Sequence, residues 1–275
     1  MLQAYRDRHF SASETAQQIL YVRSPGAIKR LALSFDAVAA DLYWIRAIQY
    51  YGGTRLSADP DKRYDLLHPL LDLTTSLDPQ FATAYRFGAF FLSDRPPGGA
   101  GRPDLAIALL RKAMAANPER WEYPYDIGFV YYRDAQYQEA AGWFQRASKV
   151  PGAAEWLEPL AAVTLATGGN LQASRVLWQN LLTNSDQDWL RQTAERRLQQ
   201  LDALDIIRQL EALTAEYGRR RGTPPPTWQA LIADGALRDV PRDPAGYPYV
   251  LTPGGKVVNV DNKSPLWPLP TEQAP

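Results

Sequence analysis

The sequence predicts a mainly α protein, an α-solenoid of helical hairpins that ends in a small C-terminal α+β module of one helix and a β-hairpin. Three observations lead to this fold class. A pattern of small and large apolar residues returns after 34 residues, the separation between Gly128 and Ala162. Apolar residues recur at helical spacing over most of the chain. The period changes to that of β-strands only near residues 247–260.

The clearest copy of the repeated pattern contains Gly128, Tyr131, Ala140 and Phe144, with Ile127 just before the glycine. Each position has a physical reason. A glycine on the first helix of a hairpin lets the second helix approach closely, and small residues on the second helix do the same. The large apolar residues fill the space between hairpins. This copy therefore predicts two antiparallel helices in close contact.

Three further copies surround it. Proline follows two of the predicted second helices, because proline cannot donate the next helical hydrogen bond. We expect Phe87, Leu110, Ile127 and Phe144 to lie in the core between hairpins. The other copies contain, in chain order, Trp44, Ala47, Ile48, Tyr51, Leu67, Leu71 and Pro79; then Phe87, Gly88, Phe91, Ala106, Leu110 and Pro118; then Ala161, Ala162, Leu165, Ser174 and Trp178.

These copies resemble the tetratricopeptide repeat family over about residues 28–200. The resemblance implies stacked helix pairs that together bury one continuous core, since a single pair cannot bury its apolar face alone. It also implies a binding protein that holds a protein partner in a concave groove and needs no cofactor. The resemblance identifies neither the partner nor a reaction.

The concave face of such an array is lined by the first helix of each pair. Residues next to the core positions of these helices are therefore the predicted partner-binding residues. Several are aromatic, and tyrosine and tryptophan are enriched in binding hot spots. The alternative is that some of these rings pack against the next helix, because the chain has 15 Tyr and 8 Trp to place. The predicted residues are Arg46, Gln49, Tyr85, Arg86, Tyr125, Phe129, Tyr132 and Trp156.

Composition narrows the possible chemistry. The chain has no cysteine and only two histidines, His9 and His68, which lie in different segments. Basic and acidic residues number 30 each, so no basic excess favours nucleic-acid binding. Asp36 and Asp41 lie beside Trp44 in an apolar segment, but no histidine or metal-ligand cluster accompanies them. We expect no catalytic residue, no cofactor and no metal.

The chain divides into four predicted segments. An extended leader is followed by the repeat domain, the C-terminal α+β module and a proline-rich tail. Within the repeat domain we expect Gly52-Gly53 to end the first helix, and we expect a long loop at residues 93–103. The boundaries are 1–24, 25–203, 204–263 and 264–275, and the other predicted helices include 61–77 and 186–218.

The C-terminal module carries the motif Asp243-Pro244-Ala245-Gly246-Tyr247-Pro248-Tyr249. This motif resembles the C-terminal region of type II secretion major pseudopilins, in which a short helix leads to such a turn and a strand pair. The chain differs from a pilin because it has no long apolar N-terminal helix. Asp243, Asp261 and Asn262 offer fewer oxygens than calcium takes, so we expect a structural turn.

Together these observations predict a non-catalytic adaptor, an accessory subunit of a bacterial cell-envelope assembly on the periplasmic side. No apolar run is long enough to span a bilayer and no signal peptide is visible. Membrane association would need a missing N-terminal anchor or a membrane-bound partner. The alternatives are a soluble cytoplasmic scaffold and a carboxylate-dependent hydrolase.

Overall fold

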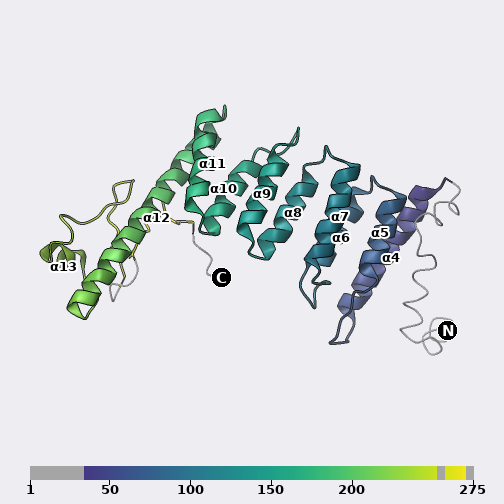
Figure 1. Cartoon of the computed structure of the whole chain (residues 1–275), viewed down its shortest axis with the longest axis horizontal. Coiled ribbons are helices and arrows are strands. Elements are labelled where there is room, and N and C mark those ends of the chain that lie inside the picture. The colour runs from purple at the N-terminus through teal and green to yellow at the C-terminus, as the bar shows by residue number, and fades with distance from the viewer. Residues whose placement is uncertain (1–33, 253–257, 271–275) are drawn as a thin grey trace. The chain divides into compact units, whose positions relative to one another are not determined.

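The computed structural model of the chain describes residues 34–252 and 258–270, and this part is mainly helical. It contains ten α-helices and one two-stranded antiparallel sheet (Figure 1). The chain forms two compact units, Met1–Leu157 and Glu158–Pro275. Each unit is described separately below. The predicted fold class, mainly α with a small C-terminal β-hairpin, is confirmed.

The first unit is a series of helical hairpins. Each helix packs against the next along the chain, and the closest pairs are α4 with α5, α6 with α7, and α8 with α9 (Figure 1). In addition, α6 touches α8 directly. The helices are α4 (Asp36–Leu56), α5 (Leu67–Leu77), α6 (Ala82–Ser93), α7 (Pro103–Ala116), α8 (Glu122–Arg133) and α9 (Tyr137–Ser148).

Two glycines allow the helices of a hairpin to approach closely. A Cβ atom on Gly88 of α6 would lie 2.7 Å from Leu71 Cδ2, and one on Gly128 of α8 would lie 2.6 Å from Phe144 Cδ1. Real Cβ atoms do not approach other carbon atoms so closely, because interiors are already packed to high density. A side chain at either position would force the facing Leu71 or Phe144 side chain to shift, in agreement with the close approach that the repeat pattern predicted.

The core of this unit lies between the helices. Leu110, Ile127 and Phe144 are almost completely buried, which confirms three of the four predicted core residues. The prediction for Phe87 was wrong, because its ring is 56% exposed. Phe87 immediately precedes Gly88, and successive residues of a helix point about 100° apart. When Gly88 faces α5 and α7, Phe87 therefore points to another side of α6.

Polar contacts also join neighbouring hairpins. The Lys112 ammonium group on α7 donates to Asp72 Oδ1 and to Ser76 Oγ, both at 2.7 Å, and to Thr75 Oγ1 at 3.0 Å. All three acceptors lie on α5, so one ammonium group forms hydrogen bonds with several groups of the preceding hairpin. The arrangement stabilises the stacking of α7 on α5.

The predicted loop between α6 and α7 is present, and it is held against the first hairpin. The hydroxyl of Tyr51 donates to the carbonyl of Gly98 and the hydroxyl of Tyr64 to that of Pro97, each at 2.9 Å. Gly101 takes a positive φ of 62°, a conformation that residues with a side chain rarely adopt. The loop is thus a fixed part of the first unit.

Three predicted helix boundaries were wrong. Helix α4 continues through Gly52-Gly53 to Leu56, and α5 begins at Leu67 rather than near residue 61. Glycine costs a helix only about 1 kcal/mol relative to alanine, so it does not by itself end a helix whose other side chains are packed. The predicted leader 1–24 lies outside the described residues. The first helix was expected to begin near Ile28, but α4 begins only at Asp36, after Ser34 with a positive φ of 76°.

The second unit is built around one long helix. Helix α11 packs along α12, and α12 also contacts the sheet. Strands β1 and β2 pair antiparallel, with Val250 opposite Asn259 and Leu251 opposite Val258. The elements are α10 (Leu157–Thr167, which begins at the last residue of the first unit), α11 (Leu171–Asn184), α12 (Asp188–Arg221), α13 (Trp228–Ala233), β1 (Val250–Leu251) and β2 (Val258–Asn259).

The predicted boundary between residues 203 and 204 falls inside α12, where the chain does not divide. One end of α12 packs against α11 and the other against α13 and the sheet, so the helix belongs to two apolar clusters. It ends at Gly222, whose φ of 75° is left-handed. Residues 253–257, between the two strands, lie outside the described residues.

The proline-rich segment after the sheet packs against α12. Leu266 and Leu269 are buried, and the buried Gln200 amide donates to the carbonyls of Leu266 and Pro268 at 2.8 and 3.0 Å. Residues 264–270 are therefore part of the C-terminal module rather than a separate tail, contrary to the predicted division.

A pair of alanine substitutions tests the close helix contact. Gly128→Ala places a methyl group against Phe144, and we expect it to lower the free energy of unfolding by about 1–3 kcal/mol. Gly142→Ala is the matched control, because Gly142 is exposed within α9 and a Cβ there meets no atom within 4 Å. It should raise the free energy of unfolding by up to about 1 kcal/mol. Urea denaturation of both variants measures the difference. Equal unfolding midpoints would show that the contact between α8 and α9 accommodates a methyl group at residue 128 without cost.

Candidate functional site

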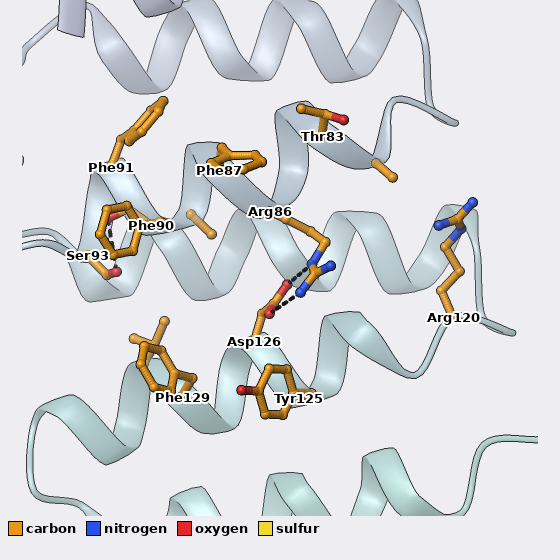
Figure 2. Close-up of a pocket in the computed structure, with 13 residues that line it drawn as sticks. Thr83, Arg86, Phe87, Phe90, Phe91, Ser93, Arg120, Tyr125, Asp126 and Phe129 are labelled. Atoms are coloured by element: carbon orange, nitrogen blue, oxygen red, sulfur yellow. Dashed lines mark hydrogen bonds and ion pairs between the residues drawn. The ribbon is translucent and has the colours of Figure 1, made fainter. Parts of the chain in front are cut away.

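A groove of about 580 Å³ lies between α6 and α8 on the first unit (Figure 2). We call it the α6–α8 groove. Its lining is mostly apolar, with a small number of charged and hydroxyl groups. The lining residues are Ala82, Thr83, Arg86, Phe87, Ala89, Phe90, Phe91, Ser93, Arg120, Tyr125, Asp126, Phe129 and Val130.

Helical periodicity explains why these side chains meet. On α6, Thr83, Arg86, Phe87 and Phe90 follow a spacing of three, one and three residues, which places them on one face of the helix. The opposite face carries Tyr85 and other buried residues that contact the hairpin core. On α8, the lining residues flank the buried position Ile127 in the same way. Each of the two helices therefore presents one face to the groove, and that face carries both apolar and polar side chains.

The groove exposes an unusual amount of aromatic surface. The exposed fractions are 56% for Phe87, 43% for Phe90 and 42% for Phe129. Figure 2 shows that Phe87 and Phe90 come from α6 and Phe129 from α8, around the same part of the groove. Exposed apolar side chains that gather in one patch mark binding surfaces more often than scattered ones do.

Neighbouring rings hold these side chains in place. Tyr125 contacts Phe129 at a centroid distance of 6.5 Å and the core residue Phe144 at 5.7 Å. On its other side Tyr125 contacts Trp156 at 5.4 Å, and Trp156 contacts Trp121 at 5.8 Å. This cluster of rings extends the apolar surface of the groove as far as Trp156, which is 45% exposed.

A two-point ion pair joins the two walls of the groove. Arg86 Nε donates to Asp126 Oδ2 at 2.6 Å and Arg86 Nη2 donates to Asp126 Oδ1 at 3.0 Å (Figure 2). Burial raises the pKa of Asp126, and the hydrogen bonds and charge of Arg86 oppose that rise. The hydrogen bonds that Arg86 donates to Asp126 raise the pKa of Arg86. The guanidinium of Arg86 thus offsets part of the cost of burying this carboxylate.

Arg120 lies at one end of the groove, in the turn before α8, and its side chain is exposed. In the part of the chain that the structure describes, it forms no ion pair. Asp126, the one acidic lining residue, is already engaged by Arg86. Arg120 therefore offers an exposed guanidinium outside the ion pair of the groove, and Glu122 in the first turn of α8 places a negative charge at the same end.

Three predicted binding residues meet in the α6–α8 groove. Arg86, Tyr125 and Phe129 all line it, and Trp156 lies beside it in contact with Tyr125. Their proximity follows from the direct contact between α6 and α8, the first helices of adjacent hairpins. Predicted residues therefore lie on both walls of the groove, and that they bind a partner stays a prediction.

The other predicted residues lie elsewhere. The prediction for Tyr85 was wrong, because its ring is fully buried against Tyr123 and its hydroxyl donates to the carbonyl of Thr75 at 3.3 Å. This burial raises the pKa of Tyr85 to about 12. Tyr132 is half-buried and packs edge-on against Tyr137 of α9, outside the lining of the groove.

Arg46 and Gln49 lie on α4 and do not line the groove either. The Arg46 guanidinium lies 5.3 Å from the centroid of the Tyr43 ring on the same helix, whereas Gln49 is exposed. An arginine over an aromatic ring is stabilised by the negative face of that ring. The structure thus gives Arg46 an internal contact and leaves Gln49 on the surface.

Sequence reasoning missed Phe87, Phe90, Arg120 and Asp126. A usable signal was present for the two phenylalanines, because they lie three residues apart on the same helix as Arg86. For Asp126 the signal was its place next to Tyr125 in the equivalent helix of the following repeat. No feature of the sequence distinguished Arg120 from other arginines.

Three other carboxylates, those of Asp36, Asp41 and Asp243, lie outside the α6–α8 groove. Asp36 and Asp41 are five residues apart on α4, so they project in different directions, and Asp41 is exposed. Asp243 is buried, and its Oδ1 accepts from the backbone N–H groups of Ala245 and Tyr247 at 2.9 Å. Its Oδ2 accepts from the hydroxyl of Ser264 at 2.5 Å, so Asp243 holds the turn together. Within residues 34–252 and 258–270, no group of three or more His, Asp or Glu residues is placed to hold a metal.

No helix of the described residues combines the length and the apolar character that a membrane crossing requires. A comparison with protein-family models matches no family, and comparisons with curated proteins and with solved structures also give no match. The site is therefore interpreted from its own geometry and chemistry.

The pKa of Asp126 predicts an unusual pH dependence. Because burial raises this pKa in the folded state, the folded chain holds the proton more tightly than the unfolded chain. The contribution of Asp126 to the free energy of unfolding should then fall as pH rises from the unfolded pKa through the raised folded pKa. We expect wild type to lose stability relative to Asp126→Asn over this window, as measured by denaturant titrations between about pH 3 and pH 7.

Asp104→Asn provides a control of opposite sign. The pKa of Asp104 is lowered by its hydrogen bond with Arg102, so its contribution should be lost as pH falls through the lowered folded pKa. Wild type should therefore gain stability relative to Asp104→Asn as pH rises. The same slope for both variants would contradict the assignment of a buried, partly compensated carboxylate at Asp126.

Proposed function

We propose that this protein is a non-catalytic adaptor that binds a protein partner in the α6–α8 groove. The observation that carries the proposal is the set of three phenylalanine rings, each about half exposed, in a groove whose walls are already fixed. The resemblance of the repeats to the tetratricopeptide family supports it, since stacked helix pairs of that family hold partners on their first helices.

The groove is organised before a partner arrives. Arg86 and Asp126 connect its walls, and Tyr125 is held by Phe144 beneath it. Aromatic side chains have few rotatable bonds, so ordering them on binding costs little conformational entropy. A groove of this kind loses less freedom on association than a surface of flexible side chains does.

The free energy available from the three rings indicates that the partner contacts more than the groove. Completing the burial of a half-exposed phenylalanine contributes about 1 kcal/mol, half of the usual value for a whole side chain. Three rings then contribute about 3 kcal/mol, which is less than the estimated 4–15 kcal/mol cost of association. The partner must therefore also contact neighbouring surface. Trp156 is the nearest candidate, because it is exposed and continuous with the groove through Tyr125.

We further propose that the adaptor is an accessory subunit of a bacterial cell-envelope assembly, with a soluble cytoplasmic scaffold as the alternative. The support is the similarity of the turn around Asp243 to that of major pseudopilins. Fractionation of cells that express the native gene distinguishes the two. Recovery with the envelope fraction favours the assembly, and recovery only in the cytoplasm overturns this placement while leaving the binding proposal standing.

Cross-linking followed by mutation tests the binding proposal. A photoreactive benzoylphenylalanine at Phe129 should capture a partner in cells, whereas the same group at Trp189, an exposed residue of the second unit, should not capture that partner. The double variant Phe90→Ser, Phe129→Ser should weaken binding of the captured partner by about 30-fold or more, the effect of losing a binding hot spot.

Val176→Ser, Trp189→Ser is the matched control, because these residues of the second unit are 45% and 49% exposed. It should bind as wild type does. Circular dichroism must show both double variants folded. Equal binding by the groove variant and wild type would remove the α6–α8 groove as the binding site.

A further inference from the structure

Away from the helix ends, the walls of the α6–α8 groove offer few free backbone groups to a ligand. Every lining residue except Arg120 lies within a helix, and in the helix interiors the backbone N–H and C=O groups are paired along the helix. An extended peptide in the apolar part of this groove would leave its own N–H and C=O groups without partners. Burying an unpaired amide is unfavourable, so an extended ligand is disfavoured. An α-helix satisfies its own backbone and avoids this penalty.

The length of the groove also suits a short helix. The lining residues of α6 extend from Ala82 to Ser93, the whole length of a 12-residue helix. At 1.5 Å per residue this is about 18 Å, the length of roughly three helical turns. Three turns are enough to present an apolar stripe of residues i, i+3 or i+4, and i+7 to the exposed rings.

The two walls share one polarity. Figure 2 shows Thr83 and Arg120 at one end of the groove, and Ser93 and Phe129 toward the other. Both α6 and α8 therefore begin at the Arg120 end, where their dipoles are positive. Glu122 in the first turn of α8 offsets part of that positive potential, and the exposed guanidinium of Arg120, which forms no ion pair within the described residues, is the group that can pair with a ligand carboxylate at this end. A ligand helix that runs in the opposite direction brings its negative C-terminal end to the same place.

We propose that the ligand of the α6–α8 groove is an amphipathic α-helix of the partner, which lies antiparallel to α6 and α8. Its apolar stripe covers Phe87, Phe90 and Phe129, and a carboxylate in its last turn or at its C-terminus faces Arg120. This inference rests on the proposed binding function, and it adds the conformation, direction and charge of the ligand.

A peptide selection tests the ligand class without knowledge of the partner. A displayed library of random peptides of about 16 residues is selected on the full chain and depleted on the Phe90→Ser, Phe129→Ser variant. The selected peptides should carry apolar residues at helical spacing and an Asp or Glu near the C-terminal end. Alanine scanning of the tightest peptide then identifies the positions that face away from the groove.

Two modified peptides separate a helical ligand from an extended one. A covalent i,i+4 staple on the outward face should tighten binding by about tenfold, because a short free helix is only marginally stable and the staple removes its ordering cost. A proline in the middle should weaken binding by at least that factor. The opposite pattern, with the staple weakening binding and proline tolerated, overturns the helical ligand.

Arg120 variants test direction and charge. Arg120→Glu should weaken the selected peptide about tenfold, whereas Arg120→Lys keeps the charge and should stay within about threefold of wild type. Moving the acidic residue to the N-terminal end of the peptide should weaken binding as well. Peptides that prefer the acid at their N-terminal end, or that are insensitive to Arg120→Glu, overturn the antiparallel orientation.

The outcomes also separate this inference from the binding proposal. Peptides that depend on Phe90 and Phe129 but carry no helical pattern overturn the ligand class alone. The ligand class is also wrong if no peptide depends on these rings while a cross-linked partner does, because a single helix is then not what the groove recognises. If neither peptides nor a cross-linked partner depend on the two rings, the proposed binding function itself falls.

Discussion

The close approach of helices at Gly88 and Gly128 is the constraint on which the rest of the first unit depends. Each glycine faces another helix at a distance that leaves no room for a methyl group. This fixes the rotation of α6 and α8 about their axes, because any other rotation would place a larger side chain at the contact. Phe87 precedes one glycine and Phe129 follows the other, and residues one position away point about 100° aside. The glycines therefore determine which rings line the groove, although neither glycine lies in it.

The pair of Arg86 and Asp126 adds specificity to this packing rather than much stability. Its carboxylate is mostly buried, and burial still raises the pKa of Asp126 in spite of the arginine. The attraction between the charges therefore does not fully offset the cost of removing the carboxylate from water, as is common for buried ion pairs. The geometry is nevertheless narrow, since two parallel hydrogen bonds form only in one relative position of α6 and α8. The pair thus defines the width of the groove on which a shape-dependent ligand relies.

Periodicity in the sequence predicted the helices, the small residues at their contacts and the late change to strands. It did not determine which face of a helix points where. Tyr85 was expected on the surface and Phe87 in the core, and the structure has them reversed. Both are aromatic, and α6 carries apolar residues on every side, so hydrophobic patterning does not resolve its rotation. Helix α4 shows the same ambiguity, because it buries Tyr43 and Ala47 on one face and exposes Leu42 and Ile45 on another. The ion pair between Arg86 and Asp126 joins residues 40 positions apart, a contact that only the stacking of hairpins creates.

The balance of charge and apolar surface also explains what kind of recognition the groove can provide. The whole chain has no formal net charge, so long-range attraction contributes little to finding a partner. If the groove binds the proposed partner, affinity comes from short-range burial of the rings, and ligands should differ mainly in their dissociation rates. Three half-exposed rings supply only part of the free energy that a stable complex needs. A helical ligand forms its own backbone hydrogen bonds, so burying it carries no penalty for unpaired amide groups. The apolar lining of the groove and the paired backbone of its helix interiors therefore both favour the helical ligand that we propose.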